Sequence, residues 1–156
     1  MIELMKIQAS NREFFWNIHQ KYLYEMTNYY DDIMDDKGNY QYGYFDDYFT
    51  DPKREAYFIY YNKNIAGFVM INPYSYLDQN PDYVLAEFTI FPVYRKQHIA
   101  TNVVEMIFKQ YLGSWEIKYN ENNIPAKRFW NKVCTKYNPQ KKSLNQFETV
   151  LLFSTK

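Results

Sequence analysis

The chain has 156 residues, of which 47% are hydrophobic, and its formal net charge is zero. This length and composition suit one globular domain over residues 1–156 with a buried core. A neutral chain has little electrostatic support for non-specific binding to nucleic acids. No apolar run approaches the roughly 20 residues that cross a bilayer. The sequence therefore predicts a protein that binds neither nucleic acid nor membrane.

The cysteine count and the N-terminus favour a reducing compartment. Cys134 is the only cysteine, which excludes an internal disulfide and a metal site built from several thiolates. The first residues lack the basic and apolar segments of a signal peptide, so we expect a cytoplasmic protein. His19 and His98 have no second ligand at metal-binding spacing, and no metal site is expected.

The first predicted element is a helix over residues 11–29. Ser10 and Glu13 have the spacing of a capping box. Apolar residues then recur at helical intervals, namely Phe14, Phe15, Ile18, Tyr22 and Met26. Residues 31–52 show no clean period and read as a loop with a short helix near residues 43–49. A connection of this length is unusual, which makes the loop a candidate for a binding role.

A hairpin and a third strand follow the loop. Residues 56–61 and 65–71 are rich in residues that favour strands, and Asn62-Lys63-Asn64 between them is a hairpin signal. After turns at Asn72-Pro73 and Asn80-Pro81, residues 83–90 form the next predicted strand.

The remaining elements alternate between helix and strand. The pattern predicts a helix over residues 99–112, which Gly113 ends. Residues 114–119 alternate as a strand does. Asn123 as N-cap, with Pro125 in the first turn, begins a third helix, and residues 147–153 form the last strand. This order predicts an α/β or α+β fold with a mixed sheet.

Charge is unevenly distributed along the chain. Between residues 29 and 51 one cation, Lys37, accompanies seven aspartates: Asp31, Asp32, Asp35, Asp36, Asp46, Asp47 and Asp51. Between residues 118 and 142 the balance is basic. This division suits a protein that holds a cationic ligand on one side and an anionic ligand on the other, although solvated loops would also explain it.

Residues 87–111 join a strand, a turn with two cations and a helix, an arrangement whose free amides attract anions. Ile90-Phe91-Pro92, followed by Arg95-Lys96-Gln97-His98-Ile99-Ala100, resembles the acetyl-CoA-binding segment of GNAT N-acetyltransferases. The family pattern is Arg/Gln-x-x-Gly-x-Gly/Ala, and His98 stands where Gly is usual. A second stretch, Asn123-Ile-Pro-Ala126-Lys-Arg-Phe-Trp130, resembles the family's Asn-x-x-Ala-x-x-aromatic segment.

The resemblance implies a fold and a cofactor. The fold is a GNAT-like mixed, mostly antiparallel twisted sheet, splayed between the strands of Ile90 and Ile117 and flanked by helices. The cofactor is acetyl-CoA (coenzyme A), with its pyrophosphate on the amides at the helix start and its pantetheine arm along the strand edge. The implied cofactor-binding residues are Phe88, Thr89, Ile90, Arg95, Lys96, Gln97, His98, Ile99, Ala100, Thr101 and Asn123.

The implied reaction is acetyl transfer to a primary amine by direct attack. Glu87 is the candidate base because many family members place one there, with Glu116 as the runner-up and a structural hydrogen bond as the alternative role. The family often has a tyrosine as general acid where this chain has Trp130. Tyr137 is our candidate acid, with Tyr94, Tyr119 or solvent as alternatives.

By the layout of the family, the acidic segment would border the site of a small-molecule or peptide amine acceptor. Its carboxylates and tyrosines suit a cationic amine such as a polyamine, an aminoglycoside or a lysine side chain. Family members often form homodimers, and the aromatic content allows one here. Two other functions stay open: a non-catalytic acyl-CoA-binding or regulatory module, which His98 and Trp130 favour, and a protein-interaction domain with a tyrosine-rich surface.

Overall fold

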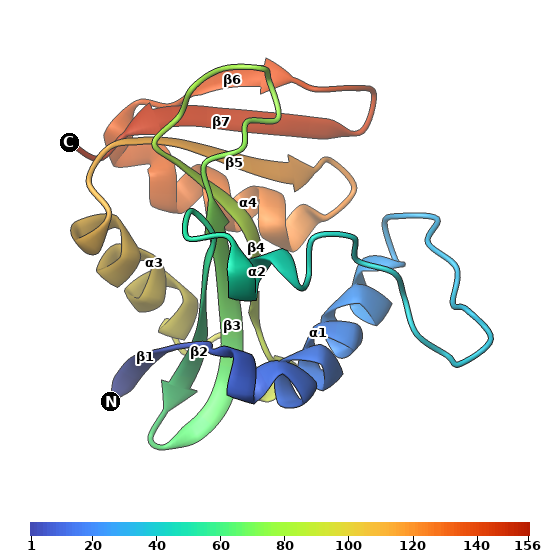
Figure 1. The fold of residues 1–156 in the computed structure, drawn as a ribbon. Coiled ribbons are helices and arrows are strands. Elements are labelled where there is room, and N and C mark those ends of the chain that lie inside the picture. Colours follow the sequence, from blue (N-terminus) through green and yellow to red (C-terminus); the bar gives the residue numbers. More distant parts are fainter.

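A seven-stranded sheet runs through the chain, and the computed structural model describes all of residues 1–156 (Figure 1). The strands are β1 (Ile2–Lys6), β2 (Glu55–Tyr61), β3 (Asn64–Asn72), β4 (Tyr83–Ile90), β5 (Ser114–Asn120), β6 (Gln140–Ser143) and β7 (Glu148–Ser154). Their order across the sheet is β1-β2-β3-β4-β5-β7-β6. Neighbours are antiparallel except β4 and β5, which run parallel. The predicted mixed, mostly antiparallel sheet is confirmed.

Helices cover both faces of this sheet. They are α1 (Arg12–Met26), α2 (Asp47–Thr50), α3 (Ile99–Gln110) and α4 (Ile124–Cys134), with 3-10 turns η1 (Ala9–Asn11), η2 (Pro92–Tyr94) and η3 (Thr135–Tyr137). Figure 1 shows α1 and α2 on one face and α3 and α4 on the other. None of these helices has both the length and the apolarity that crossing a membrane requires.

Each face has its own apolar core. The larger core lies under α3 and α4 and includes Val103, Ile107 and Trp115, all nearly inaccessible to solvent. The smaller core lies under α1 and α2, where Phe15 and Phe68 are fully buried. Burial of apolar surface is the main favourable contribution to folding, so the two cores fix the sheet between its helices.

The predicted elements are present, with shifted ends. The first helix ends at Met26 rather than near residue 29, and α2 begins at Asp47, later than the short helix expected near residues 43–49. The capping box expected at Ser10 is wrong, because the chain makes a 3-10 turn there and the amide of Gln8 donates to Asn11 Oδ1 at 3.1 Å. Two strands, β1 and β6, were not expected at all.

One residue of β4 interrupts its pairing with β3. The register shifts between Met70 and Ile71, which leaves Ala86 as the extra residue of a β-bulge. A bulge breaks the alternation of side chains between the two faces. Ala86 and Glu87 consequently both face α1: Ala86 packs against the smaller core, and Glu87 accepts a hydrogen bond from Tyr22.

The strands β4 and β5 separate after a short paired stretch. They pair only at the start, where Tyr83, Val84 and Leu85 lie opposite residues 115–117. Beyond that point residues 87–90 pair only with β3, and residues 118–120 pair only with β7. The predicted splay between the strands of Ile90 and Ile117 is confirmed.

Gly67 permits the close approach of β3 to β4. A Cβ atom at this position would lie 2.0 Å from the carbonyl oxygen of Thr89. We expect Gly67→Ala to lower the free energy of unfolding by about 1–3 kcal/mol, as overpacked sites do, measured by urea unfolding. Gly43→Ala is the matched control, since a Cβ there meets no atom within 4 Å. Equal stability of the two variants would contradict this expectation.

Candidate functional site

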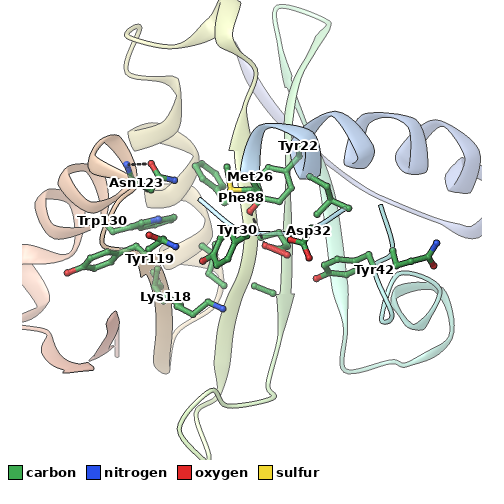
Figure 2. A pocket seen from close by; sticks show the side chains of 18 residues that line it. Tyr22, Met26, Tyr30, Asp32, Tyr42, Phe88, Lys118, Tyr119, Asn123 and Trp130 are labelled. Atoms are coloured by element: carbon green, nitrogen blue, oxygen red, sulfur yellow. Dashed lines mark hydrogen bonds between the residues drawn. The ribbon is translucent and has the colours of Figure 1, made fainter. Parts of the chain in front are cut away.

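The splay between β4 and β5 opens into a cavity of about 320 Å³, here called the splay pocket. Its walls come from the divergent parts of both strands, from the end of α1 and the loop after it, and from the start of α4. Figure 2 shows Tyr119 and Trp130 on one side of it, and Tyr22 and Tyr42 on the other. Residues widely separated in sequence are thus brought to one site.

Glu87 lies in the wall of this pocket beneath α1. The hydroxyl of Tyr22 donates a hydrogen bond to Glu87 Oε1 at 2.9 Å. Burial raises the pKa of the Glu87 carboxyl above its ordinary value, while the hydroxyls of Tyr22 and Tyr42 and the charge of Lys118 act in the opposite direction. A half-buried carboxylate with a raised pKa is suited to accepting a proton.

The runner-up base, Glu116, has a structural role. It is fully buried and accepts hydrogen bonds from the hydroxyl of Ser75 and from the amide of Tyr76, at 2.9 Å for the latter. These contacts hold the loop between β3 and β4 onto β5. Glu116 does not line the splay pocket.

The candidate acid, Tyr137, lies outside the splay pocket. Its ring stacks on Phe153 with the centroids 5.5 Å apart and meets Phe108 edge-on. The alternative Tyr94 packs against Tyr61. Of the three tyrosines considered from the sequence, Tyr119 alone lines the pocket.

The amides at the start of α3 are free. None of the backbone N–H groups of residues 96–101 donates a hydrogen bond within the protein, and the first helical bond runs from Asn102 to His98. Lys96 and His98 both have φ of +62°, and both side chains are exposed. Left-handed residues next to a helix start direct consecutive N–H groups into an anion-binding concavity.

His98 therefore has the backbone conformation for which glycine is usual. Its exposed side chain leaves the amide accessible. Ile99 can offer an anion only its amide, because the residue is 2% exposed and belongs to the larger core. The half-buried Ala100 packs against the same core. Gln97 is tied by its side chain to the carbonyl of Val93 at 3.1 Å.

The two cations before α3 have different surroundings. Arg95 makes a bidentate ion pair with Glu25, both nitrogen–oxygen distances being 2.8 Å, and its Nε donates to the Ile90 carbonyl at 2.6 Å. This side chain thus joins α1 to the end of β4 instead of being free for a phosphate. Lys96 is exposed and has no ion-pair partner.

The free edge of β4 offers fewer groups than expected. Thr89 lies opposite Phe68, and its carbonyl faces Gly67 of β3. Peptide groups alternate between the two edges of an antiparallel strand, so Phe88 and Ile90 direct theirs toward the splay. Arg95 already donates to the Ile90 carbonyl. The backbone groups left for a ligand are therefore the N–H and C=O of Phe88 and the N–H of Ile90.

The second stretch of the resemblance lies at the opposite wall. Asn123 is the N-cap of α4, and its Oδ1 accepts from the amide of Ala126 at 3.2 Å. Asn123, Ala126 and Trp130 line the splay pocket together. Figure 2 shows Asn123 and Trp130 on this wall. Trp130 meets Phe88 edge-on, with the centroids 5.5 Å apart, so α4 contacts β4 across the splay.

A second cavity of about 520 Å³ adjoins the first. We call it the tyrosine pocket, because Tyr42, Tyr44, Tyr74 and Tyr76 line it. It shares Tyr42, Ala86, Glu87 and Lys118 with the splay pocket. Glu87 thus lines two adjoining cavities.

The aspartates of residues 29–51 are mostly outside these cavities. Asp32 lines the splay pocket. Asp35 accepts from the amides of Lys37 and Asn39 within its own turn. Asp46 pairs with Arg12 at 2.5 Å, and Asp51 pairs with Arg54 at 3.2 Å. Three of the seven aspartates are therefore engaged in local contacts, and one, Asp32, faces the splay pocket.

Several residues of the site have no signal of their own in the sequence. These are Tyr22, Lys118 and Arg54, which line one or both pockets, whereas Tyr30 belongs to the segment that was expected to border the acceptor. The helical pattern places Tyr22 only in an apolar stripe, and the excess of tyrosine is the one available indication. Which of 18 tyrosines face a cavity depends on tertiary packing.

Other chemistry has little support. No group of three or more His, Cys, Asp or Glu side chains is arranged to hold a metal ion. Cys134 is fully buried in the larger core, and burial raises the pKa of its thiol to about 12. A thiolate nucleophile is therefore not accessible in this fold.

Comparison with known proteins identifies the family. The profile of the family described as Acetyltransferase (GNAT) matches residues 12–135. None of the curated proteins matches this chain in sequence.

Three solved structures share the fold. An acetyltransferase from Thermus thermophilus is 13% identical, with 99% of this chain and 97% of that chain covered and a TM-score of 0.72. NAA60 from Arabidopsis thaliana, in complex with acetyl-CoA, is 12% identical, with 99% and 98% covered and a TM-score of 0.61. The PaiA N-acetyltransferase from Thermoplasma acidophilum, in complex with coenzyme A, is 11% identical, with 99% of each chain covered and a TM-score of 0.63.

At these identities the structures establish the fold, and the family profile establishes membership. The predicted class, an acetyltransferase with acetyl-CoA as cofactor, is confirmed. Because the profile extends over most of its length, the chain belongs to the acetyltransferase (GNAT) family.

Proposed function

We propose that this protein transfers the acetyl group of acetyl-CoA to a primary amine by direct attack, with Glu87 as general base. The observation that carries the proposal is the position of Glu87. A bulge directs this carboxylate into the wall between two adjoining cavities, and burial raises its pKa.

The free groups around the splay fit coenzyme A. The unpaired amides of residues 96–101 would hold the pyrophosphate oxygens, with the exposed Lys96 adding a nearby charge. Phe88, with the N–H of Ile90, would bond the pantetheine arm as an added strand does. Asn123 and Ala126 would line its other side. Thr89 and Arg95 would act indirectly, by holding the end of β4.

Acetyl-CoA supplies a thioester whose carbonyl carbon is open to attack by a neutral amine. Glu87 would accept the proton that the acceptor nitrogen loses as its bond to that carbon forms and the carbon–sulfur bond breaks. Solvent in the splay would return a proton to the departing sulfur. Direct attack is favoured over an acetylated enzyme because Cys134, the only thiol, is buried with a raised pKa.

The acceptor is a small-molecule or peptide amine. The run of seven aspartates suggested a strongly cationic acceptor. Of these aspartates only Asp32 lines either pocket, so the support for such an acceptor rests on Asp32. A cytoplasmic location remains the prediction from the single buried thiol.

Thermal melting with and without coenzyme A tests cofactor binding first. Bound ligand raises stability by about 2.7 kcal/mol at a hundredfold excess over Kd. Lys96→Glu is expected to weaken this stabilisation, because it places a negative charge beside the phosphates. Lys109→Glu makes the same change in the last turn of α3 and should leave it unaltered.

The rival functions give different results. Stabilisation by coenzyme A with no acetyl transfer across a broad panel of amines would favour a non-catalytic acyl-CoA-binding module. No stabilisation at all would favour a protein-interaction domain and contradict our proposal.

A further inference from the structure

The tyrosine pocket contains a cation held in an unusual way. Arg54, which follows α2, lines this pocket, and its side chain is only 11% exposed. Three tyrosine rings surround the guanidinium: its carbon lies 4.5 Å from the ring centroid of Tyr74, 4.8 Å from Tyr44 and 5.5 Å from Tyr48. Such contacts fix a guanidinium through its faces and leave its edges available.

The hydrogen bonds of Arg54 are incomplete. Its Nε donates to Asp51 Oδ2 at 3.2 Å. No further hydrogen bond from its two terminal nitrogens, Nη1 and Nη2, is seen within the protein, and the Tyr48 hydroxyl is a polar neighbour of the guanidinium besides Asp51. Neither nitrogen is among the buried polar atoms that lack a partner, so both are open to the tyrosine pocket, where a bound molecule can accept hydrogen bonds from them.

Asp51 pairs with only one edge of the Arg54 guanidinium. This carboxylate also accepts from the hydroxyl of Tyr74 at 2.6 Å and from the amide of Lys53 at 2.9 Å. Three donors thus share it, and it holds only the Nε edge of the guanidinium. The remaining edge, with two parallel N–H groups, matches the geometry of a second carboxylate.

The other cation in the tyrosine pocket is paired with a carboxylate. Lys118 Nζ lies 2.9 Å from Glu148 Oε2 and 4.6 Å from the centroid of the Tyr76 ring. Glu148 also accepts from Tyr30 at 2.7 Å. Arg54 is the cation of this pocket that offers two parallel N–H donors to a carboxylate, because its own ion pair uses only Nε.

We propose that the acceptor is an amine that also carries a carboxylate, with the amine at Glu87, an aromatic or apolar body between the tyrosines, and the carboxylate on the terminal nitrogens of Arg54. This inference rests on the proposed function and adds the substrate class. Glu87 and Arg54 line the same pocket, so it recognises both ends of one small molecule. An amine without the carboxylate leaves the guanidinium unpaired, which is the costly case.

Matched pairs of acceptors test this assignment. Phenylalanine is compared with 2-phenylethylamine, tyrosine with tyramine, and 4-(aminomethyl)benzoate with benzylamine, with release of the coenzyme A thiol as the measurement. In at least one pair, kcat/KM for the carboxylate-bearing amine should exceed that of its partner at least tenfold. Arg54→Met should lower this ratio at least tenfold.

The control variant is Arg12→Met. Arg12 also pairs with an aspartate, Asp46, and lies over the rings of Trp16 and Phe45, but it lines neither pocket. It should keep the ratio. If Arg54→Met does not fold by thermal melting, Arg54→Lys keeps the charge without the paired donors and should still reduce the ratio.

The inference is overturned if no pair is discriminated, or if the preference persists in the folded Arg54 variants. If coenzyme A binds but no amine is acetylated, the proposed function fails. The binding of each amine to the protein then tests the role of Arg54. Titration of each amine, followed by NMR, then decides: carboxylate-dependent binding that Arg54→Met removes supports it, and its absence overturns it.

Discussion

Glu87→Gln is expected to lower kcat at least about 100-fold while the protein still binds acetyl-CoA. General bases contribute about 10²–10⁴ in rate, and the amide cannot accept a proton from the acceptor. Gln keeps the size of the side chain and an oxygen for the Tyr22 hydroxyl, which bonds Glu87 at 2.9 Å. Steady-state kinetics and coenzyme A-dependent thermal melting measure the two effects separately.

The pH dependence gives a sharper signature. A base acts when deprotonated, so activity should rise with pH through the pKa of Glu87, which burial places above the ordinary carboxyl value. This acidic limb should be absent from the residual activity of Glu87→Gln. Tyr22→Phe removes a donor that favours the carboxylate, so the limb should move to higher pH. Tyr24→Phe, exposed on the same helix, is the control.

Glu87→Gln should also stabilise the fold at neutral pH. Because the folded pKa of Glu87 is raised, folding binds its proton more tightly, and the associated stability is present at low pH and lost as pH rises through the folded pKa. A neutral Gln avoids this loss, so the melting temperature at pH 7 should increase. A variant with unchanged kcat, or with cofactor binding lost in proportion to kcat, would contradict the role of Glu87.

The sequence predicted those parts of the fold that depend on local pattern. The β4 strand and the start of α3 at Ile99 were predicted to the residue, because a turn at Asn80-Pro81 precedes the largely apolar strand and helical spacing is strong in α3. The strand β6 was missed because Gln140–Ser143 has no apolar face, and main-chain pairing with β7 holds it. The strand β1 is likewise a short edge strand that is largely exposed.

The candidate site was only partly predictable. Family resemblance led to Glu87 and to His98, whose φ of +62° is the conformation that the usual glycine would serve. The bulge at Ala86, which directs Glu87 toward α1, leaves no mark in the sequence because it is a property of the β3–β4 register. Arg95 was expected near phosphate, but Glu25, 70 residues away in the chain, binds it instead.

His19→Phe is expected to raise the free energy of unfolding at pH 7 by about 1–3 kcal/mol. His19 is fully inaccessible to solvent, and neither of its ring nitrogens has a hydrogen-bond partner. An unpaired buried polar group costs about 1–3 kcal/mol. Its neighbours are rings, including Tyr42 at 4.5 Å and Phe68 at 5.5 Å between centroids, so a phenyl ring retains these contacts.

The gain from His19→Phe should increase as the pH falls. Burial lowers the pKa of His19 to about 3, from 6.5 in the unfolded chain. The unfolded chain therefore binds a proton that the folded one does not, and stability is lost as the pH falls from 6.5 toward 3. At pH 4.5 this loss amounts to about 2.7 kcal/mol, two pH units at about 1.36 kcal/mol each, and the Phe variant does not incur it.

Urea unfolding at several pH values between 7 and 4.5 measures this difference. The chain has two histidines, and the exposed His98 supplies the control. Asn tolerates the left-handed conformation at that position, so His98→Asn should keep the acid sensitivity of the parent. If His19→Phe is no more stable at pH 4.5 relative to the parent than at pH 7, His19 must reach a proton and a partner in the folded state. The rings of Tyr22 and Tyr42, which contact His19 and also line the splay pocket, would then have to move to admit them.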